Sequence, residues 1–196
     1  MTDLVIIVDN DAEGRVESVF LRNADHVVGL GHRAASYCLG VNAGTWESNH
    51  AITSLMYRYA EYIDAADFDA IGKLLANASL TNEGVDGTVD GAEAIANLYR
   101  RSNRVHDDGT LRTRHVTSNV LVEIDEEAGT ASARSAFVVL QQTAVLPLQP
   151  IATGRYRDRF ARTQGEWHFV QRHIIVDHVG DVREHLSLEI ARLLDK

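Results

Sequence analysis

The sequence predicts an α+β fold in which a curved, mainly antiparallel (mixed) sheet forms a cone around helices that come first in the chain. Apolar residues recur at helical spacing between residues 48 and 101, whereas from residue 112 onward they alternate with polar residues over four long stretches. Helices followed by a run of long strands are typical of this class. Because a long meander must curl or be covered on one face, we expect a conical pocket between the helices and the sheet.

Three amphipathic helices are expected before the strands. The first covers residues 48–63, and a short second one follows Asp67, a plausible N-cap. A small hairpin at residues 78–90 leads to the third helix, residues 92–101. Apolar spacing also predicts a last helix at residues 182–194.

Four long strands account for most of the second half. They are expected at residues 112–124, 130–142, 151–162 and 167–179. Short turns separate consecutive strands, and acidic residues with a glycine at 125–129 are typical turn residues. The sequence therefore favours antiparallel neighbours in chain order.

The first 45 residues differ from the rest. Residues 4–8 and 16–21 have the character of two strands joined by a turn, while residues 24–45 show no clear period. We therefore expect an N-terminal extension, residues 1–45, made of a hairpin and a linker, and a cone domain at residues 46–196.

Composition excludes several classes of protein. The chain has 196 residues, with 28 acidic and 19 basic residues and a formal net charge of −9. That balance argues against a nucleic-acid partner and against docking on an anionic membrane. A single cysteine, Cys38, excludes an internal disulfide framework and fits a reducing compartment. With no secretory signal and no apolar run near 20 residues, a cytoplasmic protein is expected.

No metal site and no cofactor are predicted. His168 and His173 lie five apart on one expected strand, so they face opposite sides and cannot share a metal ion. Residues 9–14 resemble the start of a calcium loop, but the position that requires a bidentate acid holds Phe20. The chain also lacks a serine nucleophile elbow, which argues against covalent catalysis.

Polar residues in otherwise apolar settings are the candidates for chemistry. Tyr59 lies in the apolar stripe of the first helix, and Asp64 ends that helix. His115 lies in the first long strand, on the face expected to carry Thr117, Asn119 and Leu121. Two of them also have a structural interpretation, because Tyr59 could be a core tyrosine and Asp64 a cap.

Arg172 is the fourth candidate. We expect Val170 and Ile174 to flank it on its own face of the last strand. A cation between apolar neighbours is unusual unless it meets an acid or a ligand. A structural salt bridge to Asp158 or Asp177 is the alternative.

Four segments give the chain a family resemblance. They are residues 57–64 (YRYAEYID), 114–120 (RHVTSNV), 154–158 (GRYRD) and 165–172 (GEWHFVQR). With them, residues 52–186 resemble the SnoaL-like branch of the nuclear transport factor 2-like superfamily. The resemblance implies a cystatin-like α+β barrel. It says less about the reaction, because this fold carries many chemistries and some proteins that are not enzymes.

The resemblance implies a set of roles. Scytalone dehydratase, the bile-acid dehydratases and a dehydrochlorinase of this superfamily place an Asp at the end of the first helix and a His early in the first long strand, where Asp64 and His115 stand. His115 would be the base and Asp64 would orient it. Tyr59 would donate to a carbonyl or a departing hydroxyl, and Arg172 would stabilise developing negative charge. The further acid that some dehydratases carry on the second strand has no clear counterpart here.

The expected reaction is a cofactor-independent elimination on a small hydrophobic, hydroxylated molecule such as a steroid, a polyketide or an aromatic. We expect the ligand to contact residues along the cone: Phe68, Leu98, Tyr99, Asn119, Phe137, Val139, Tyr156 and Ile174.

Other functions remain open at this stage. An isomerase or polyketide cyclase would use Asp64 as its base. A scaffold resembling the small subunit of ring-hydroxylating dioxygenases would use the alternating Arg155, Arg157 and Arg159 as a subunit interface, and a binding module would use the pocket without chemistry. We also expect a homodimer or homotrimer, because the outer face is expected to expose Val116, Val120 and Val122.

Overall fold

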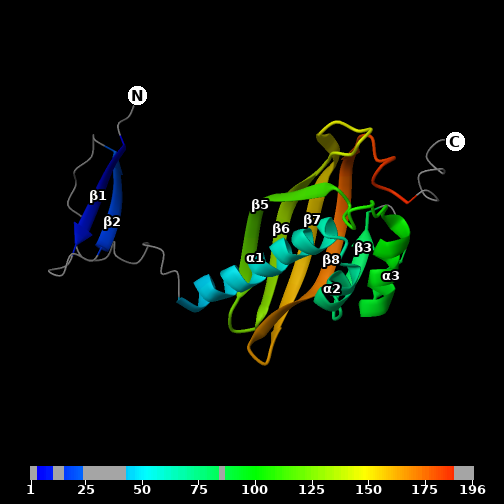
Figure 1. The fold of residues 1–196 in the computed structure, drawn as a ribbon. Helices are drawn as coiled ribbons and strands as arrows, with labels where there is room; N and C mark the ends of the chain where they lie inside the picture. Colours follow the sequence, from blue (N-terminus) through cyan, green and yellow to red (C-terminus); the bar gives the residue numbers. More distant parts are fainter. Residues whose placement is uncertain (1–3, 11–15, 24–42, 84–86, 188–196) are drawn as a thin grey trace. The chain divides into compact units, whose positions relative to one another are not determined.

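The computed structural model describes residues 4–10, 16–23, 43–83 and 87–187 (Figure 1). The chain divides into two compact units, Met1–Asn42 and Ala43–Lys196, and each is described by itself. In the first unit, β1 (Leu4–Asn10) pairs with β2 (Val16–Asn23) as an antiparallel hairpin. Both strands lie where the sequence predicts them.

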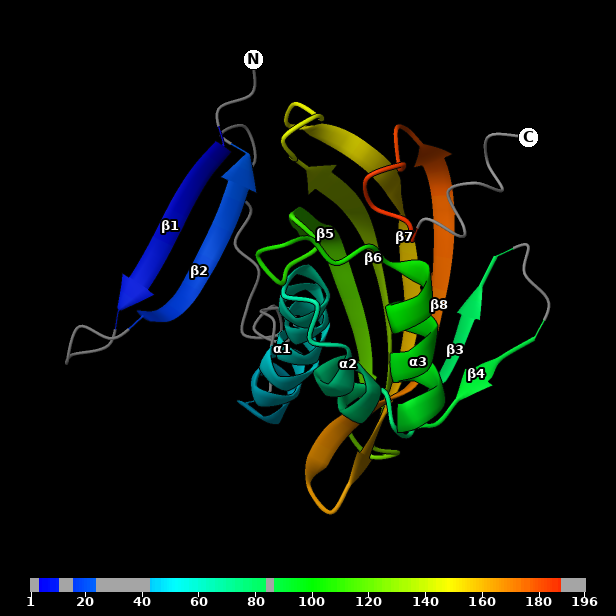
Figure 2. The same ribbon diagram turned by 45° about the vertical axis from the view of Figure 1, so that its right-hand side comes forward.

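The second unit contains three helices and six strands among its described residues. They are α1 (Ala43–Asp64), α2 (Phe68–Leu74), β3 (Ser79–Asn82), β4 (Val89–Asp90), α3 (Ala92–Ser102), β5 (Thr113–Asp125), β6 (Thr130–Gln141), β7 (Gln149–Thr163) and β8 (Glu166–Val179). The helices gather on one face of the sheet (Figure 2). The predicted α+β class is confirmed, and each predicted helix and strand between residues 48 and 179 is present.

The sheet has the strand order β4-β3-β8-β7-β6-β5. Neighbours pair antiparallel except β3 and β8, which run parallel, so the sheet is mixed. It curves around the helices without closing, because β4 and β5 are both edge strands.

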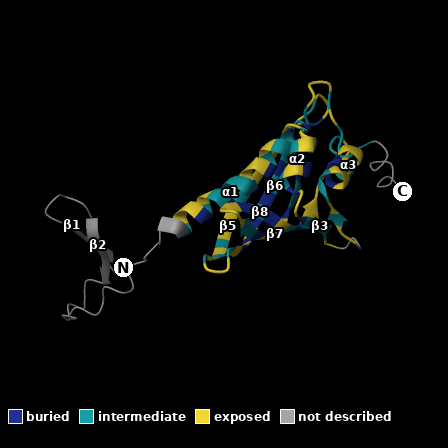
Figure 3. Ribbon diagram, turned by 90° about the horizontal axis from the view of Figure 1, so that it is seen from below, coloured by how far each residue is buried: buried dark blue, intermediate teal, exposed yellow. Residues whose placement is uncertain are grey.

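The core lies between the helices and the concave face of the sheet, where buried residues meet in Figure 3. Helix α1 buries Ile52, Met56, Tyr59 and Ile63, which recur every three or four residues. Helix α2 begins where predicted, because the Asp67 side chain accepts a hydrogen bond from the backbone N–H of Ala70 at 3.0 Å. None of the described helices has the length and apolar character needed to cross a bilayer.

A β-bulge in β5 corrects two expectations about that strand. The register with β6 shifts between Ser118 and Leu121, and Asn119 has a φ of +52°. The extra residue reverses the faces of the strand, so that Asn119 and Leu121 are exposed and do not share the inner face with His115.

The same bulge changes the outer face. Val120 and Val122 pack against the core, and of the three valines expected outside only Val116 is exposed. The apolar outer surface that motivated the prediction of a homo-oligomer is therefore smaller than expected. The oligomeric state stays a prediction.

A second bulge changes the surroundings of Arg172. The β7–β8 register skips Val170, which is exposed, while Arg172 two residues later is fully buried. The expectation that Val170 flanks Arg172 on its face is wrong for this reason. Ile174 does lie on the inner side, against the core.

The chain after β8 is not helical over residues 182–187. These residues form a turn, and Leu186 makes an isolated antiparallel bridge with Asn103 at the end of α3. The backbone N–H groups of His185 and Leu186 donate to the carbonyl of Val182 within the turn, whereas the N–H of Ser187 donates to the carbonyl of Ser102 at 2.9 Å. The rest of the predicted helix, residues 188–194, lies outside the described residues.

Candidate active site

A cavity of about 340 Å³ opens between the helices and one end of the sheet. Its lining is mostly apolar: Tyr59, Ile63, Tyr99, Asn103, His115, Phe137, Val139, Ala152, Tyr156, Ile174, Val176, Val179, Val182, His185 and Leu186. Three hollows are larger. Two of them lie over the polar outer side of the sheet and include Arg159, the third lies beside Arg104 and Glu184, and none of the three contains His115. The cavity is the candidate site because it combines apolar walls with a few polar groups.

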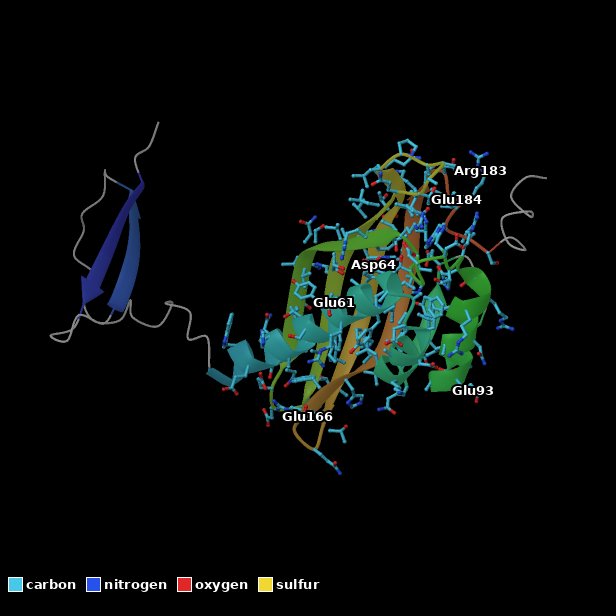
Figure 4. The ribbon with its side chains drawn as sticks, in the orientation of Figure 1. Glu61, Asp64, Glu93, Glu166, Arg183 and Glu184 are labelled. Atoms are coloured by element: carbon cyan, nitrogen blue, oxygen red, sulfur yellow. The ribbon has the colours of Figure 1, made fainter. Side chains whose placement is uncertain are left out.

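Asp64 and His115 meet at the wall of this cavity. Asp64 ends α1 and His115 lies near the start of β5; Figure 4 marks Asp64 at the end of its helix. One carboxylate oxygen of Asp64 lies 2.6 Å from Nδ1 of His115, and the other accepts a 2.9 Å hydrogen bond from the backbone N–H of His115. The hydroxyl of Thr113 donates to the same carboxylate at 2.7 Å.

These contacts fix the direction of the hydrogen bond between Asp64 and His115. Burial by itself raises the pKa of Asp64, but the hydrogen bonds and charge of His115 and the hydroxyl of Thr113 outweigh it, and the pKa lies below its ordinary value. The carboxylate is therefore an acceptor, and Nδ1 of His115 carries the proton that it receives. In the neutral ring with this orientation the lone pair is on Nε2, which is the arrangement of an oriented general base.

Tyrosines supply the next polar group. The hydroxyls of Tyr59 and Tyr99 lie 2.7 Å apart in a buried hydrogen bond, and both rings line the cavity. Burial raises the pKa of both, so both keep their protons at neutral pH. Since one proton serves the bond between them, the other O–H is available to a ligand oxygen.

Arg172 lies behind the tyrosines and does not line the cavity. Its guanidinium makes two 3.0 Å hydrogen bonds to the buried carboxylate of Asp158 and lies 4.0 Å and 4.2 Å from the ring centres of Tyr59 and Tyr156. Burial alone would lower the pKa of Arg172, but Asp158 and the tyrosines raise it, so the group stays charged. Of the two salt bridges considered for it, the one to Asp158 forms, while Asp177 pairs with Arg155.

The predicted contact residues fall into two groups. Those that line the cavity are Tyr99, Phe137, Val139, Tyr156 and Ile174. Phe68 stacks on Tyr99 with ring centres 6.4 Å apart, so it supports the wall without lining it, and Leu98 packs on the core from outside the lining. Asn119 is on the outer side of the sheet because of the bulge in β5.

His185 is the polar lining residue that the sequence interpretation missed. It follows β8 in the segment expected to be helical, and burial, with a smaller contribution from the charge of His115, lowers its pKa to about 4. A histidine one position before an apolar residue, Leu186, gave no signal that it faces a cavity. Among the described residues, no three His, Cys, Asp or Glu side chains come together as a metal site would require.

Comparisons with known proteins identify the family and the fold of this chain. The family of SnoaL-like domains matches residues 44–173 of the chain. No curated protein matches. An NTF2-like protein with a cystatin-like fold from Novosphingobium aromaticivorans is 22% identical, with a TM-score of 0.59 over 78% of this chain and 92% of that one.

Two more solved structures from the same organism share the fold. A putative scytalone dehydratase is 19% identical, with a TM-score of 0.55 over 70% of this chain and 89% of its own. The beta subunit of a putative aromatic-ring-hydroxylating dioxygenase is 18% identical, with a TM-score of 0.55 over 70% of this chain and 94% of its own. At these identities the likeness shows the NTF2-like, cystatin-like fold.

Proposed function

We propose that this chain, which belongs to the SnoaL-like domain family, is a cofactor-independent lyase that removes water from a small hydrophobic, hydroxylated molecule. The observation that carries the proposal is the Asp64–His115 pair on the wall of an apolar cavity, with the two side chains 2.6 Å apart. A purely structural role would not require a histidine oriented by a carboxylate to face an apolar cavity. It is suited to move a proton at a bound ligand.

In the proposed reaction, Nε2 of His115 takes a proton from a carbon next to an activating group. The electron pair of that C–H bond forms the new double bond, and the C–O bond to the hydroxyl breaks. The departing hydroxide takes up the proton that His115 has accepted, so water leaves and the enzyme returns to its starting state. Asp64 stabilises the imidazolium while it exists.

The free O–H of the Tyr59–Tyr99 pair would stabilise negative charge on a carbonyl oxygen of the substrate. Arg172 acts on this O–H through the Tyr59 ring. Its positive charge lies 4.0 Å from the centre of that ring and makes the phenol a better hydrogen-bond donor. Its role is therefore one of positioning and electrostatics, and we do not propose that it contacts the substrate.

An isomerase or cyclase with Asp64 as base is less well supported. The Asp64 carboxylate already accepts hydrogen bonds from Thr113, from the backbone of His115 and from its ring. These bonds lower the pKa of Asp64 and so make it a weaker base. The lone pair that remains available in the cavity belongs to His115.

The cavity volume limits the substrate. About 340 Å³ is near the small end of the range for ligand pockets, which suits a compact ring system. A screen of hydroxylated steroids, polyketides and small aromatics, with loss of water followed by mass spectrometry, tests the proposal. His115→Ala should reduce turnover of the compound found by about 10²–10⁴-fold. Undiminished turnover would exclude His115 as the base.

Scaffolding is a second candidate, and the outer face of the sheet favours it. Arg134 and Arg157 lie directly opposite each other across β6 and β7, although like charges at such positions destabilise a sheet. An acidic surface on another subunit, or on a second copy of this chain, would relieve that repulsion. Arg157→Glu should weaken assembly measured by sedimentation while leaving turnover unchanged; if turnover alone responds, this candidate fails.

A further inference from the structure

The segment after β8 brings a second imidazole into the cavity, and backbone hydrogen bonds hold it there. The carbonyl of His185 accepts a 2.8 Å hydrogen bond from the backbone N–H of Arg104, and its own N–H donates to the carbonyl of Val182 at 3.0 Å. Val182 and Leu186, on either side, also line the cavity. The ring of His185 is thus presented from a fixed backbone.

Glu184 strengthens this attachment. Its carbonyl accepts hydrogen bonds from the side chain of Gln141 at 3.1 Å and lies 3.1 Å from Nε2 of His106, while its carboxylate pairs with Arg104 at 2.6 Å. Side chains from β6 and from the loop after α3 therefore position the segment. Such support around a ligand-facing group is what precise recognition requires.

One nitrogen of the His185 ring lacks a hydrogen-bond partner. Nδ1 of His185 is buried and has no hydrogen-bond partner among the described residues. An unpaired polar atom in an apolar setting costs free energy unless something satisfies it. Two other polar groups of the lining already have partners: the Asn103 amide donates to the carbonyl of Tyr99, and Nδ1 of His115 faces Asp64. The free O–H of the Tyr59–Tyr99 pair and Nε2 of His115 are the groups that the proposed reaction uses.

We propose that His185 is a specificity-determining residue, whose neutral imidazole hydrogen-bonds a hydroxyl group of an uncharged, ring-containing ligand. A hydroxyl fits either tautomer, because it both donates and accepts. An anionic ligand is disfavoured, since Arg172, the buried cation behind the tyrosines, is already paired with Asp158. The inference rests on the proposed function for the cavity it uses, but it requires no turnover.

Binding of a matched pair of probes tests the proposal. 2-Naphthol and 2-methylnaphthalene have nearly the same shape and differ in one hydroxyl. The wild-type protein should bind 2-naphthol about tenfold more tightly, as one neutral hydrogen bond provides. His185→Leu should lose this preference and bind 2-methylnaphthalene within about threefold of the wild-type affinity.

A conservative variant and a spectroscopic measurement distinguish the loss of one hydrogen bond from misfolding of the variant. His185→Asn places an amide near the position of Nδ1, so it should keep part of the preference. The imidazole ¹⁵N signals of His185 should shift with 2-naphthol and not with 2-methylnaphthalene. His173→Leu, a histidine outside the cavity, should behave as wild type.

A preference for 2-naphthol that survives in His185→Leu, or its absence from the wild type, would overturn the proposal. So would failure of both probes to bind. A failed search for a dehydrated product would count against the proposed reaction alone, because these measurements use ligands that do not react.

Discussion

Asp64 accepts hydrogen bonds from both the backbone N–H and the ring Nδ1 of His115. The helix that ends at Asp64 is thereby joined to the strand that carries His115, and the same carboxylate sets the tautomer of the ring. The fold and the proposed chemistry therefore depend on the same atoms. A substitution at Asp64 must therefore be compared with a variant that weakens the structural contacts of this carboxylate and leaves its contact with the His115 ring intact.

Asp64→Asn should reduce kcat by roughly 10²–10⁴-fold, because an amide that donates toward Nδ1 favours the wrong tautomer and cannot stabilise the imidazolium. Steady-state kinetics on the compound found by the screen measure this effect. Thr113→Val is the matched control, since it removes another hydrogen bond to the same carboxylate and leaves the ring contact intact. Its kcat should stay within about tenfold of wild type. Equal losses in the two variants would mean that Asp64 has only a structural role.

Arg172→Leu should destabilise the protein by about 3–5 kcal/mol, because it leaves the buried carboxylate of Asp158 without its partner. Urea unfolding measures this loss. The double variant Arg172→Leu with Asp158→Leu should recover most of the stability, since two apolar side chains then replace the pair. If the double variant folds but its turnover falls by more than about 100-fold, Arg172 contributes directly to catalysis and the positioning role is wrong.

The sequence was sufficient for the helices and strands between residues 48 and 179, because these depend on local periodicity. The Asp64–His115 pair was expected from the family resemblance, since periodicity does not show which residues of a helix and a strand meet. The sequence was not sufficient wherever one extra residue changes the face of a strand. The bulges at Asn119 and Val170 are single insertions, and alternation gives no sign of them. Arg172 was correctly singled out as an unusual cation, but only the fold shows that it is paired with Asp158 through Nε and Nη2, while Nη1 has no hydrogen-bond partner among the described residues.

His185 was missed for a different reason. Apolar spacing predicts a helix after β8, but the backbone groups of residues 185 and 187 bond instead to the end of α3. Such tertiary contacts override a local helical pattern, and they involve residues about 80 positions apart that no window along the chain can compare.

The pH dependence of stability should reveal His185. Burial lowers its pKa from 6.5 to about 4 in the folded state, with His115 and His106 also lowering it and Asp64 opposing them. Between these two values the unfolded chain binds more protons, so stability is fully present above pH 6.5 and is lost as the pH falls toward 4. The whole effect is on the order of 3 kcal/mol.

Urea unfolding of wild type and His185→Asn at pH 7, 5.5 and 4.5 isolates this contribution. Wild type should lose more stability than the variant as the pH falls, because only wild type has the buried imidazole. Asp64 does not interfere, since its pKa lies below 3.8 and its own contribution is lost only at more acid pH. Parallel loss of stability in the two proteins would show that His185 is not the buried titrating group.

Gly154→Ala should both destabilise the fold and reduce the cavity. A Cβ at Gly154 would lie 2.1 Å from the carbonyl oxygen of Ile175 and 2.6 Å from the ring of Phe137, and both must move. Overpacking of this kind costs about 1–3 kcal/mol, and displacement of Phe137 would narrow the space for a ligand.

Gly72→Ala is the matched control, because its Cβ would lie 2.3 Å from the carbonyl oxygen of Ala92, between α2 and α3 and away from the cavity lining. Both variants should unfold at lower urea concentrations, but only Gly154→Ala should weaken binding of 2-naphthol to the folded protein. Equal affinity in the two would mean that Phe137 does not limit the cavity.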